Sequence, residues 1–161
     1  MMSDPVQLAA RTAWGEARGE GAAGMQAVLN TIAARVAQPG WWGHDIASVC
    51  TASCHGIHQF SCWNEEDPNH DAMLAVGERD PAFRSALLMA QRLEAGMLPD
   101  IVRGADSYFA LGSDRPFWAT WERFRCTRGR HAFYQVGVHG GGPVAVSGSA
   151  PATQAGREVH H

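Results

Sequence analysis

The sequence predicts a mainly helical α+β domain with a small antiparallel β element. Three segments with helical signals occupy the first 95 residues, and short aromatic runs with β character follow between residues 105 and 138. A length of 161 residues fits one domain that can bury a core. We expect that domain over residues 1–138, and a flexible tail over residues 139–161, where Gly, Ser, Ala, Pro and Thr dominate.

Each expected helix has its own start or stop signal. The run Ser3-Asp4-Pro5 is typical of a helix start and predicts a first helix over residues 6–17, before two glycines. The second helix follows from a continuous apolar stripe over residues 25–36, which Pro39 ends. A third helix is expected over residues 81–95, with Asp80 before it as the cap.

The remaining segments are less regular. Residues 41–71 lack a clear period and are rich in Trp, His, Cys and Asn, which suits a structured loop region beside a site. Residues 106–110 and 131–136 alternate in the manner of short strands or a hairpin.

Charge and hydropathy exclude two classes of partner. The formal net charge is −3, whereas a dedicated nucleic-acid binder usually carries a basic excess, so we expect no nucleic acid. No run approaches the ~20 apolar residues of a membrane span, so we expect no stable membrane insertion.

The first residues lack the basic and apolar regions of a secretory signal, which predicts a protein made and first held in the cytoplasm.

One loop concentrates metal-ligand residue types. Cys50, Cys54, His55, His58 and Cys62 offer five candidate zinc ligands, although their spacing matches no familiar zinc motif closely. A disulfide between Cys50 and Cys62, or unpaired thiols, are the alternatives, and all three remain open. We expect no cofactor.

The densest polar run near the N-terminus is Trp14-Gly15-Glu16-Ala17-Arg18-Gly19-Glu20-Gly21. Glu16 falls at the expected end of a helix, where the helix dipole favours the protonated acid, as a general acid for glycoside cleavage requires. The two glutamates are four residues apart, but the glycines leave their separation in space open. From the chemistry alone, a solvated helix end is the favoured interpretation, because such a run is not specific.

Four ordered segments resemble the SleB-type (spore-cortex-lytic) cell wall hydrolase family. They are Ala10-Arg11-Thr12-Ala13-Trp14-Gly15-Glu16-Ala17-Arg18-Gly19-Glu20-Gly21, Gln59-Phe60-Ser61-Cys62-Trp63-Asn64, Gly104-Ala105-Asp106-Ser107-Tyr108-Phe109 and Gly129-Arg130-His131-Ala132-Phe133-Tyr134. The resemblance implies a lysozyme-like, lytic-transglycosylase-like fold. It also implies cleavage of peptidoglycan between N-acetylmuramic acid and N-acetylglucosamine, by a transglycosylase or a muramidase, with Glu16 as the catalytic acid/base.

The same segments supply the expected substrate-binding residues. Phe60, Trp63 and Tyr108 are expected to stack on sugar rings, with ordinary core packing as the alternative. Gln59, Ser61 and Asn64 are expected to bind N-acetyl groups, with a purely structural loop role as the alternative. Glu20, His131 and Tyr134 complete the set.

The expected partner is bacterial peptidoglycan. Without a visible export signal, we expect an endolysin-like, bacteriolytic enzyme of phage or prophage type, released to the wall by a holin. The rival hypotheses are a zinc-dependent amidase or peptidase that uses the Cys/His loop, and a non-catalytic peptidoglycan-binding module.

One basic segment has no assigned role. Residues 123–130 contain four arginines, too few for a nucleic-acid surface on an acidic chain. We interpret the segment as a solvated, charged strand edge, with contact to acidic peptide stems or anionic lipids as the alternative.

Overall fold

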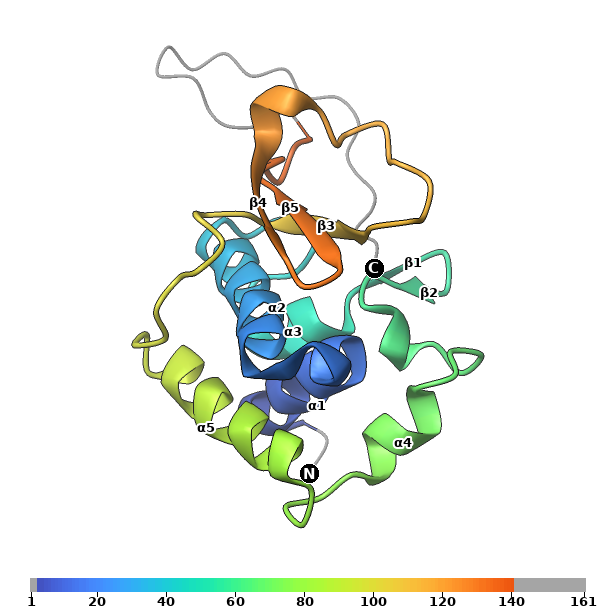
Figure 1. Ribbon diagram of the computed structural model, residues 1–161, viewed down its shortest axis with the longest axis vertical. Coiled ribbons are helices and arrows are strands. Elements are labelled where there is room, and N and C mark those ends of the chain that lie inside the picture. The colour runs from blue at the N-terminus through green and yellow to red at the C-terminus, as the bar shows by residue number, and fades with distance from the viewer. Residues whose placement is uncertain (1–2, 141–161) are drawn as a thin grey trace.

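Helix α1 (Pro5–Ala17) lies at the centre of the helical part of the molecule (Figure 1). In the computed structural model, which describes residues 3–140, α1 packs against each of the other helices: α2 (Gly21–Ala37), α3 (Ile46–Thr51), α4 (His70–Ala75) and α5 (Pro81–Glu94). Almost all of the tail expected over residues 139–161 lies outside the described residues. Within residues 3–140, no helix is long and apolar enough to cross a bilayer.

The three predicted helices are confirmed, together with the caps of two of them. The Asp4 carboxylate accepts a hydrogen bond from the backbone N–H of Val6 at 3.1 Å, which starts α1. Asp80 does the same for α5 through the N–H of Phe83 at 3.0 Å. In α2 the predicted stripe is the core face, and its residues Met25, Val28, Leu29 and Ile32 are buried.

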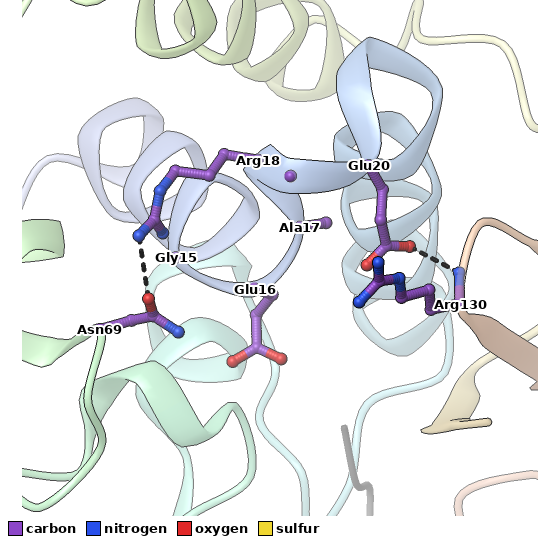
Figure 2. A pocket seen from close by; sticks show the side chains of 8 residues that line it. Gly15, Glu16, Ala17, Arg18, Glu20, Asn69 and Arg130 are labelled. Atoms are coloured by element: carbon purple, nitrogen blue, oxygen red, sulfur yellow. Dashed lines mark hydrogen bonds between the residues drawn. The ribbon is translucent and has the colours of Figure 1, made fainter. Parts of the chain in front are cut away.

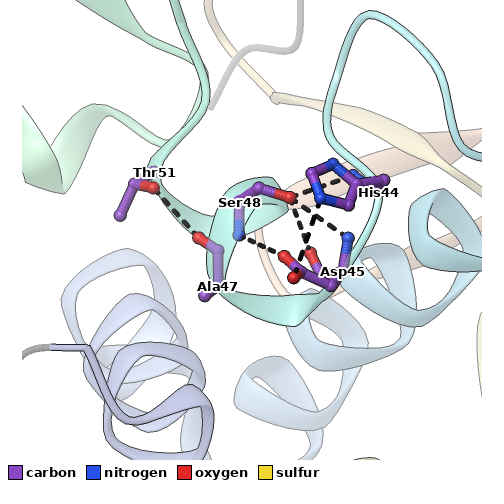
Figure 3. Close-up of polar contacts among 5 residues, drawn as sticks. All are labelled: His44, Asp45, Ala47, Ser48 and Thr51. Carbon is purple, nitrogen blue, oxygen red and sulfur yellow. Dashed lines mark hydrogen bonds and ion pairs between the residues drawn. The ribbon is translucent and has the colours of Figure 1, made fainter.

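The region over residues 41–71 contains more regular structure than its sequence predicts. It holds α3, the strands β1 (Ser53–Cys54) and β2 (Ile57–His58), the short 3₁₀ helix η2 (Ser61–Trp63) and the start of α4. Helix α3 has only six residues, and a reciprocal capping box holds its start (Figure 3). The Ser48 N–H donates to the Asp45 carboxylate at 2.8 Å, and the Asp45 N–H donates to the Ser48 hydroxyl at 3.1 Å.

Three antiparallel strands form a sheet above the helices in Figure 1: β3 (Ser107–Ala110), β4 (Phe124–Arg128) and β5 (His131–Tyr134), in the order β3-β5-β4. The runs predicted as β structure correspond to β3 and β5. The arginine-rich segment runs from the end of η3 through the edge strand β4 to the turn after it, so the expected strand edge is present. Its arginines in β4 are partly buried and bound by the protein, so they are not the solvated side chains that we expected. Short 3₁₀ turns, η1 (Arg18–Glu20) and η3 (Trp121–Arg123), precede α2 and β4.

The two faces of this sheet belong to different cores. Successive side chains of a strand point to opposite faces, so Tyr108 and Phe133 join the main helical core. Phe109 and Tyr134 point the other way and pack with Trp118 in a separate, smaller aromatic cluster. The sheet therefore presents only one face to the end of α1.

A buried arginine joins α2 to the sheet. Arg35 is 1% exposed, and its Nε donates to the backbone carbonyl of Asp106 at 2.8 Å. Its guanidinium also lies 4.5 Å from the centre of the Trp42 ring. Burial raises the pKa of Asp106, although the carboxylate accepts hydrogen bonds from the N–H groups of Val136 and Gly137. These Arg35 contacts hold the start of β3 against α2. They therefore help to set the position of Tyr108 in β3.

Candidate active site

Glu16 lies in the last turn of α1, where the chain comes very close to η2. A Cβ atom placed on Gly15 would stand 2.8 Å from both Cβ and Sγ of Cys62, a separation that real side chains do not tolerate. Glycine at this position therefore lets η2 lie directly against the helix end. As a result the backbone N–H of Cys62 reaches the Glu16 carboxylate and donates to Oε2 at 3.1 Å.

The second carboxylate oxygen of Glu16 is held from the sheet. The Tyr108 hydroxyl donates to Oε1 at 2.8 Å. Tyr108 is completely buried, and burial followed by the Glu16 charge raises the pKa of the phenol well above its usual value. The hydroxyl therefore keeps its proton and serves as a permanent donor. Two donors from different parts of the fold thus fix the orientation of one carboxylate.

The Glu16 side chain faces a cavity of about 340 Å³ (Figure 2). This volume is within the range of about 300–1,000 Å³ typical of ligand pockets. The cavity is lined by the α1–η1 corner and by two residues from distant segments: Gly15, Glu16, Ala17, Arg18, Gly19, Glu20, Asn69 and Arg130. On one side Arg18 stacks on the Trp14 ring at 4.0 Å and donates to the Asn69 side chain at 2.9 Å.

Glu20 forms the opposite side of this cavity, where it is bound to the turn between β4 and β5. Its Oε1 accepts a hydrogen bond from the Arg130 N–H at 3.0 Å and lies 3.1 Å from Nδ1 of His131. A Cβ atom on Gly129 would overlap this carboxylate, so the turn approaches Glu20 as closely as only glycine permits. Both glutamates therefore line the cavity and are held by the protein, Glu16 at its two oxygens by Cys62 and Tyr108 and Glu20 at Oε1 by the β4–β5 turn.

The predicted residues of the 59–64 segment lie in η2 or next to it. Trp63 is partly exposed and its indole N–H donates to the Thr12 hydroxyl at 2.9 Å. The side-chain oxygen of Asn64 accepts a hydrogen bond from the backbone N–H of His58 at 2.8 Å, which links β2 to the end of η2. Ser61 is partly exposed, and Gln59 is buried.

Three aromatic predictions are corrected by burial. Phe60 and Tyr108 are both 0% exposed, so neither ring offers a face on which a sugar could stack. Phe60 packs in the main core, and Tyr108 acts through its hydroxyl instead. Tyr134 lies on the far face of the sheet in the second aromatic cluster, so it does not line the cavity. His131 is buried beside Tyr108, with the ring centres 5.0 Å apart, and contacts Glu20.

The Cys/His loop forms neither a metal site nor a disulfide. All four cysteines are free thiols, so the Cys50–Cys62 disulfide is absent from the structure. Within the described part of the chain, no three His, Cys, Asp or Glu side chains come together as metal ligands. Cys50 and Cys62 are buried against α1, while Cys54 and His55 are exposed at the β1–β2 turn. Burial raises the pKa of Cys50 to about 12 and that of Cys62 further, so both remain neutral thiols.

Two site residues could not be assigned to the cavity from the sequence. Asn69 had no local signal, and Arg130 was one of four arginines in a segment without an assigned role; the tertiary fold brings both to the cavity. The backbone donor of Cys62 could not be foreseen either, although Gly15 marks the close contact that brings it to Glu16.

A family model described as Cell Wall Hydrolase matches residues 19–134. The chain belongs to the cell wall hydrolase family. The matched segment covers Glu20, η2 and the whole sheet, and it begins just after Glu16. This cell wall hydrolase is thus an enzyme whose family acts on bacterial peptidoglycan.

Two solved structures have the same fold as this hydrolase. The catalytic domain of the germination-specific lytic transglycosylase SleB from Bacillus anthracis is 22% identical, with a TM-score of 0.59, and the match covers 81% of this chain and 93% of that one. The catalytic domain of the Bacillus cereus SleB protein is also 22% identical, with a TM-score of 0.56 and coverage of 81% and 89%. The predicted mainly helical α+β fold is confirmed by these matches. No curated protein matches the chain significantly.

Proposed function

We propose that this cell wall hydrolase cleaves the glycan strand of peptidoglycan between N-acetylmuramic acid and N-acetylglucosamine, with Glu16 as general acid and base. One observation carries the proposal. The Glu16 carboxylate faces a ligand-sized cavity while the Cys62 N–H and the Tyr108 hydroxyl hold its two oxygens. Such fixed orientation is what proton transfer to a substrate atom requires.

In the proposed reaction, protonated Glu16 donates its proton to the oxygen that links the two sugars. The bond between that oxygen and C1 of N-acetylmuramic acid breaks, and N-acetylglucosamine leaves with a free hydroxyl. The Glu16 carboxylate then removes the proton from the 6-hydroxyl of the same muramic acid, whose oxygen bonds to C1. The product is a 1,6-anhydro-muramic acid end, and Glu16 is protonated again. No water is consumed.

The surroundings of Glu20 favour this transglycosylase reaction over hydrolysis. A hydrolase of the usual type needs a second carboxylate to activate water or to attack the sugar. Glu20 is the other carboxylate at the cavity, and its Oε1 is occupied by the Arg130 N–H and by His131. A nucleophile that belongs to the substrate removes the need for a second carboxylate.

Product analysis tests the proposal. Purified sacculi are digested by the wild type and by Glu16→Gln, and the soluble products are identified by mass spectrometry. We expect fragments with 1,6-anhydro ends from the wild type and none from Glu16→Gln. Reducing muramic acid ends would mean that the enzyme is a muramidase and not a transglycosylase. Freed stem peptides, with Glu16→Gln still active, would favour an amidase or peptidase.

A bacteriolytic role as an endolysin released by a holin is a further part of this proposal, and it rests on the sequence expectation alone. It predicts that bacteria expressing the protein stay intact until their inner membrane is permeabilised, and then lyse. Glu16→Gln is the matched control in this culture-turbidity experiment. Absence of lysis after permeabilisation would contradict the endolysin role without affecting the cleavage chemistry.

A further inference from the structure

The four arginines of the 123–130 segment do not share one environment. Three of them are bound by the protein itself. Arg123 donates to the backbone carbonyl of Trp118 at 3.1 Å, Arg125 donates to the Gln135 side chain at 2.7 Å, and Arg128 donates to the Ile101 carbonyl at 3.1 Å. The fourth, Arg130, lines the Glu16 cavity, and within residues 3–140 its guanidinium donates to no other group.

The backbone of Arg130 is held at this position by the β4–β5 turn. Gly129 has a φ of +57°, at the place where a two-residue hairpin turn requires glycine. The next N–H, that of Arg130, is fixed by Glu20 at 3.0 Å. A turn residue with a fixed backbone and an unengaged guanidinium is suited to bind a ligand in the cavity (Figure 2).

A second cation faces the same space. Arg18 lines the cavity from the end of α1, oriented by the Trp14 ring and by Asn69. In the described part of the chain, neither Arg18 nor Arg130 forms an ion pair with an acidic side chain. The Glu20 charge is already met by the Arg130 N–H and by His131, and Glu16 is held by its own two donors. The Arg130 guanidinium therefore remains available to an anionic group of the substrate. Arg18, which already donates to the Trp14 carbonyl and to Asn69, adds a positive charge on the other side of the cavity.

We infer that Arg130, with Arg18 across the cavity, binds a carboxylate on the lactyl branch of muramic acid beside the bond that is cut. This inference rests on the proposed function. The sugar rings and N-acetyl groups of the strand are uncharged, so the carboxylates of a peptidoglycan repeat lie on this branch. Guanidinium groups bind carboxylates through paired, charge-assisted hydrogen bonds. The carboxylate belongs either to the stem peptide or to the lactyl group itself where the stem has been removed.

Three substrates and two variants test this assignment. The substrates are native sacculi, the same sacculi with carboxylates converted to amides by carbodiimide and ammonia, and glycan strands stripped of stems by an amidase. The variants are Arg130→Gln and the control Arg128→Gln, which removes the same charge from the same hairpin outside the cavity. Thermal unfolding confirms that each variant folds, and release of glycan fragments gives apparent KM and kcat.

We expect Arg130→Gln to raise the apparent KM on native sacculi about tenfold, as the loss of a hydrogen bond between charged groups does, with kcat changed less than about twofold. Amidation should raise the apparent KM of the wild type similarly and leave Arg130→Gln unchanged. On native sacculi the lactyl carboxyl group is bonded to the stem, so an Arg130 effect there that amidation removes assigns a stem-peptide carboxylate. An Arg130 effect confined to stripped strands assigns the free lactyl carboxylate.

Wild-type enzyme that cleaves amidated and native sacculi equally well, with Arg130→Gln matching Arg128→Gln on all three substrates, would overturn the assignment while leaving the proposed function intact. Wild-type enzyme that releases no glycan fragments from any of the three substrates would overturn both.

Discussion

The end of α1 and the 3₁₀ turn that follows it place two glutamates at one cavity with different hydrogen-bond partners. Glu16 receives donors from η2 and β3 and presents its carboxylate to the cavity. Glu20, only four residues later, accepts a hydrogen bond from the Arg130 N–H in the β4–β5 turn and contacts His131, and its side chain is 13% exposed. Under the proposed function, Glu16 exchanges a proton with the substrate, while Glu20 has a structural role. The difference lies in which groups the fold brings to each carboxylate.

The largest expected effect is that of Glu16→Gln. The amide keeps the shape of the side chain but cannot exchange a proton with the substrate, and general acid/base catalysis contributes about 10²–10⁴-fold. We therefore predict that kcat on sacculi falls by at least about 100-fold, with an unchanged unfolding temperature. Glu66→Gln, at an exposed loop position, is the control and should match the wild type.

Tyr108→Phe should have the next largest effect. It removes the donor to Oε1 of Glu16, and hydrogen bonds to charged groups are worth about 1.5–3 kcal/mol, so we predict a fall in kcat of roughly 10- to 100-fold. Tyr134→Phe makes the same change on the other face of the sheet and should alter kcat less than twofold. Equal rates for the two variants would show that the Glu16–Tyr108 contact does not contribute to catalysis.

Glu20→Gln tests whether Glu20 has a structural role or takes part in catalysis. We predict a decrease of about 1–2 kcal/mol in the free energy of unfolding, because a charged acceptor of two hydrogen bonds is replaced by a neutral one, and a kcat within about fivefold of the wild type. Denaturant unfolding and sacculus digestion measure the two quantities. If Glu20→Gln lowers kcat as strongly as Glu16→Gln, Glu20 is a second catalytic carboxylate and the enzyme is better described as a hydrolase.

Gly129→Ala should give a smaller effect on catalysis than on stability. Alanine is strained at a φ of +57°, and its Cβ would also overlap the Glu20 carboxylate, so we predict a loss of about 1–3 kcal/mol. Gly56→Ala is the matched control, because Gly56 also has a positive φ in a hairpin turn but has open space around it. The difference between the two variants in chemical denaturation measures the contact with Glu20. Equal losses would indicate that this contact is unimportant.

Local sequence signals predicted those parts of the fold that local interactions determine. The caps Asp4 and Asp80 and the apolar stripe of α2 were sufficient for the three long helices. Helix α3 was missed because six residues are too few to show a helical period, although Asp45 and Ser48 carried the signal of its capping box. The buried role of Arg35 was also missed, because it depends on a partner 71 residues away.

The candidate site was predictable only in part, because it also depends on contacts between residues that are distant in the sequence. A strand pattern shows that Tyr108 and Phe109 face opposite sides, but it does not show which side is the main core. Tyr108 was therefore expected to stack on sugar, whereas it is buried as a donor to Glu16. Tyr134 was expected to bind substrate, whereas it lies on the other face of the sheet. Arg130 was visible only as one of four arginines, and the turn geometry that singles it out is tertiary.

The most direct test of the mechanism is digestion of sacculi in water enriched in oxygen-18, followed by mass spectrometry of the new muramic acid ends. If Glu16 acts alone and the 6-hydroxyl of the substrate is the nucleophile, the ends are 1,6-anhydro rings, lighter than reducing ends by one water and without the heavy oxygen. Reducing ends that carry oxygen-18 would contradict this mechanism, because they require a water molecule activated by a second group.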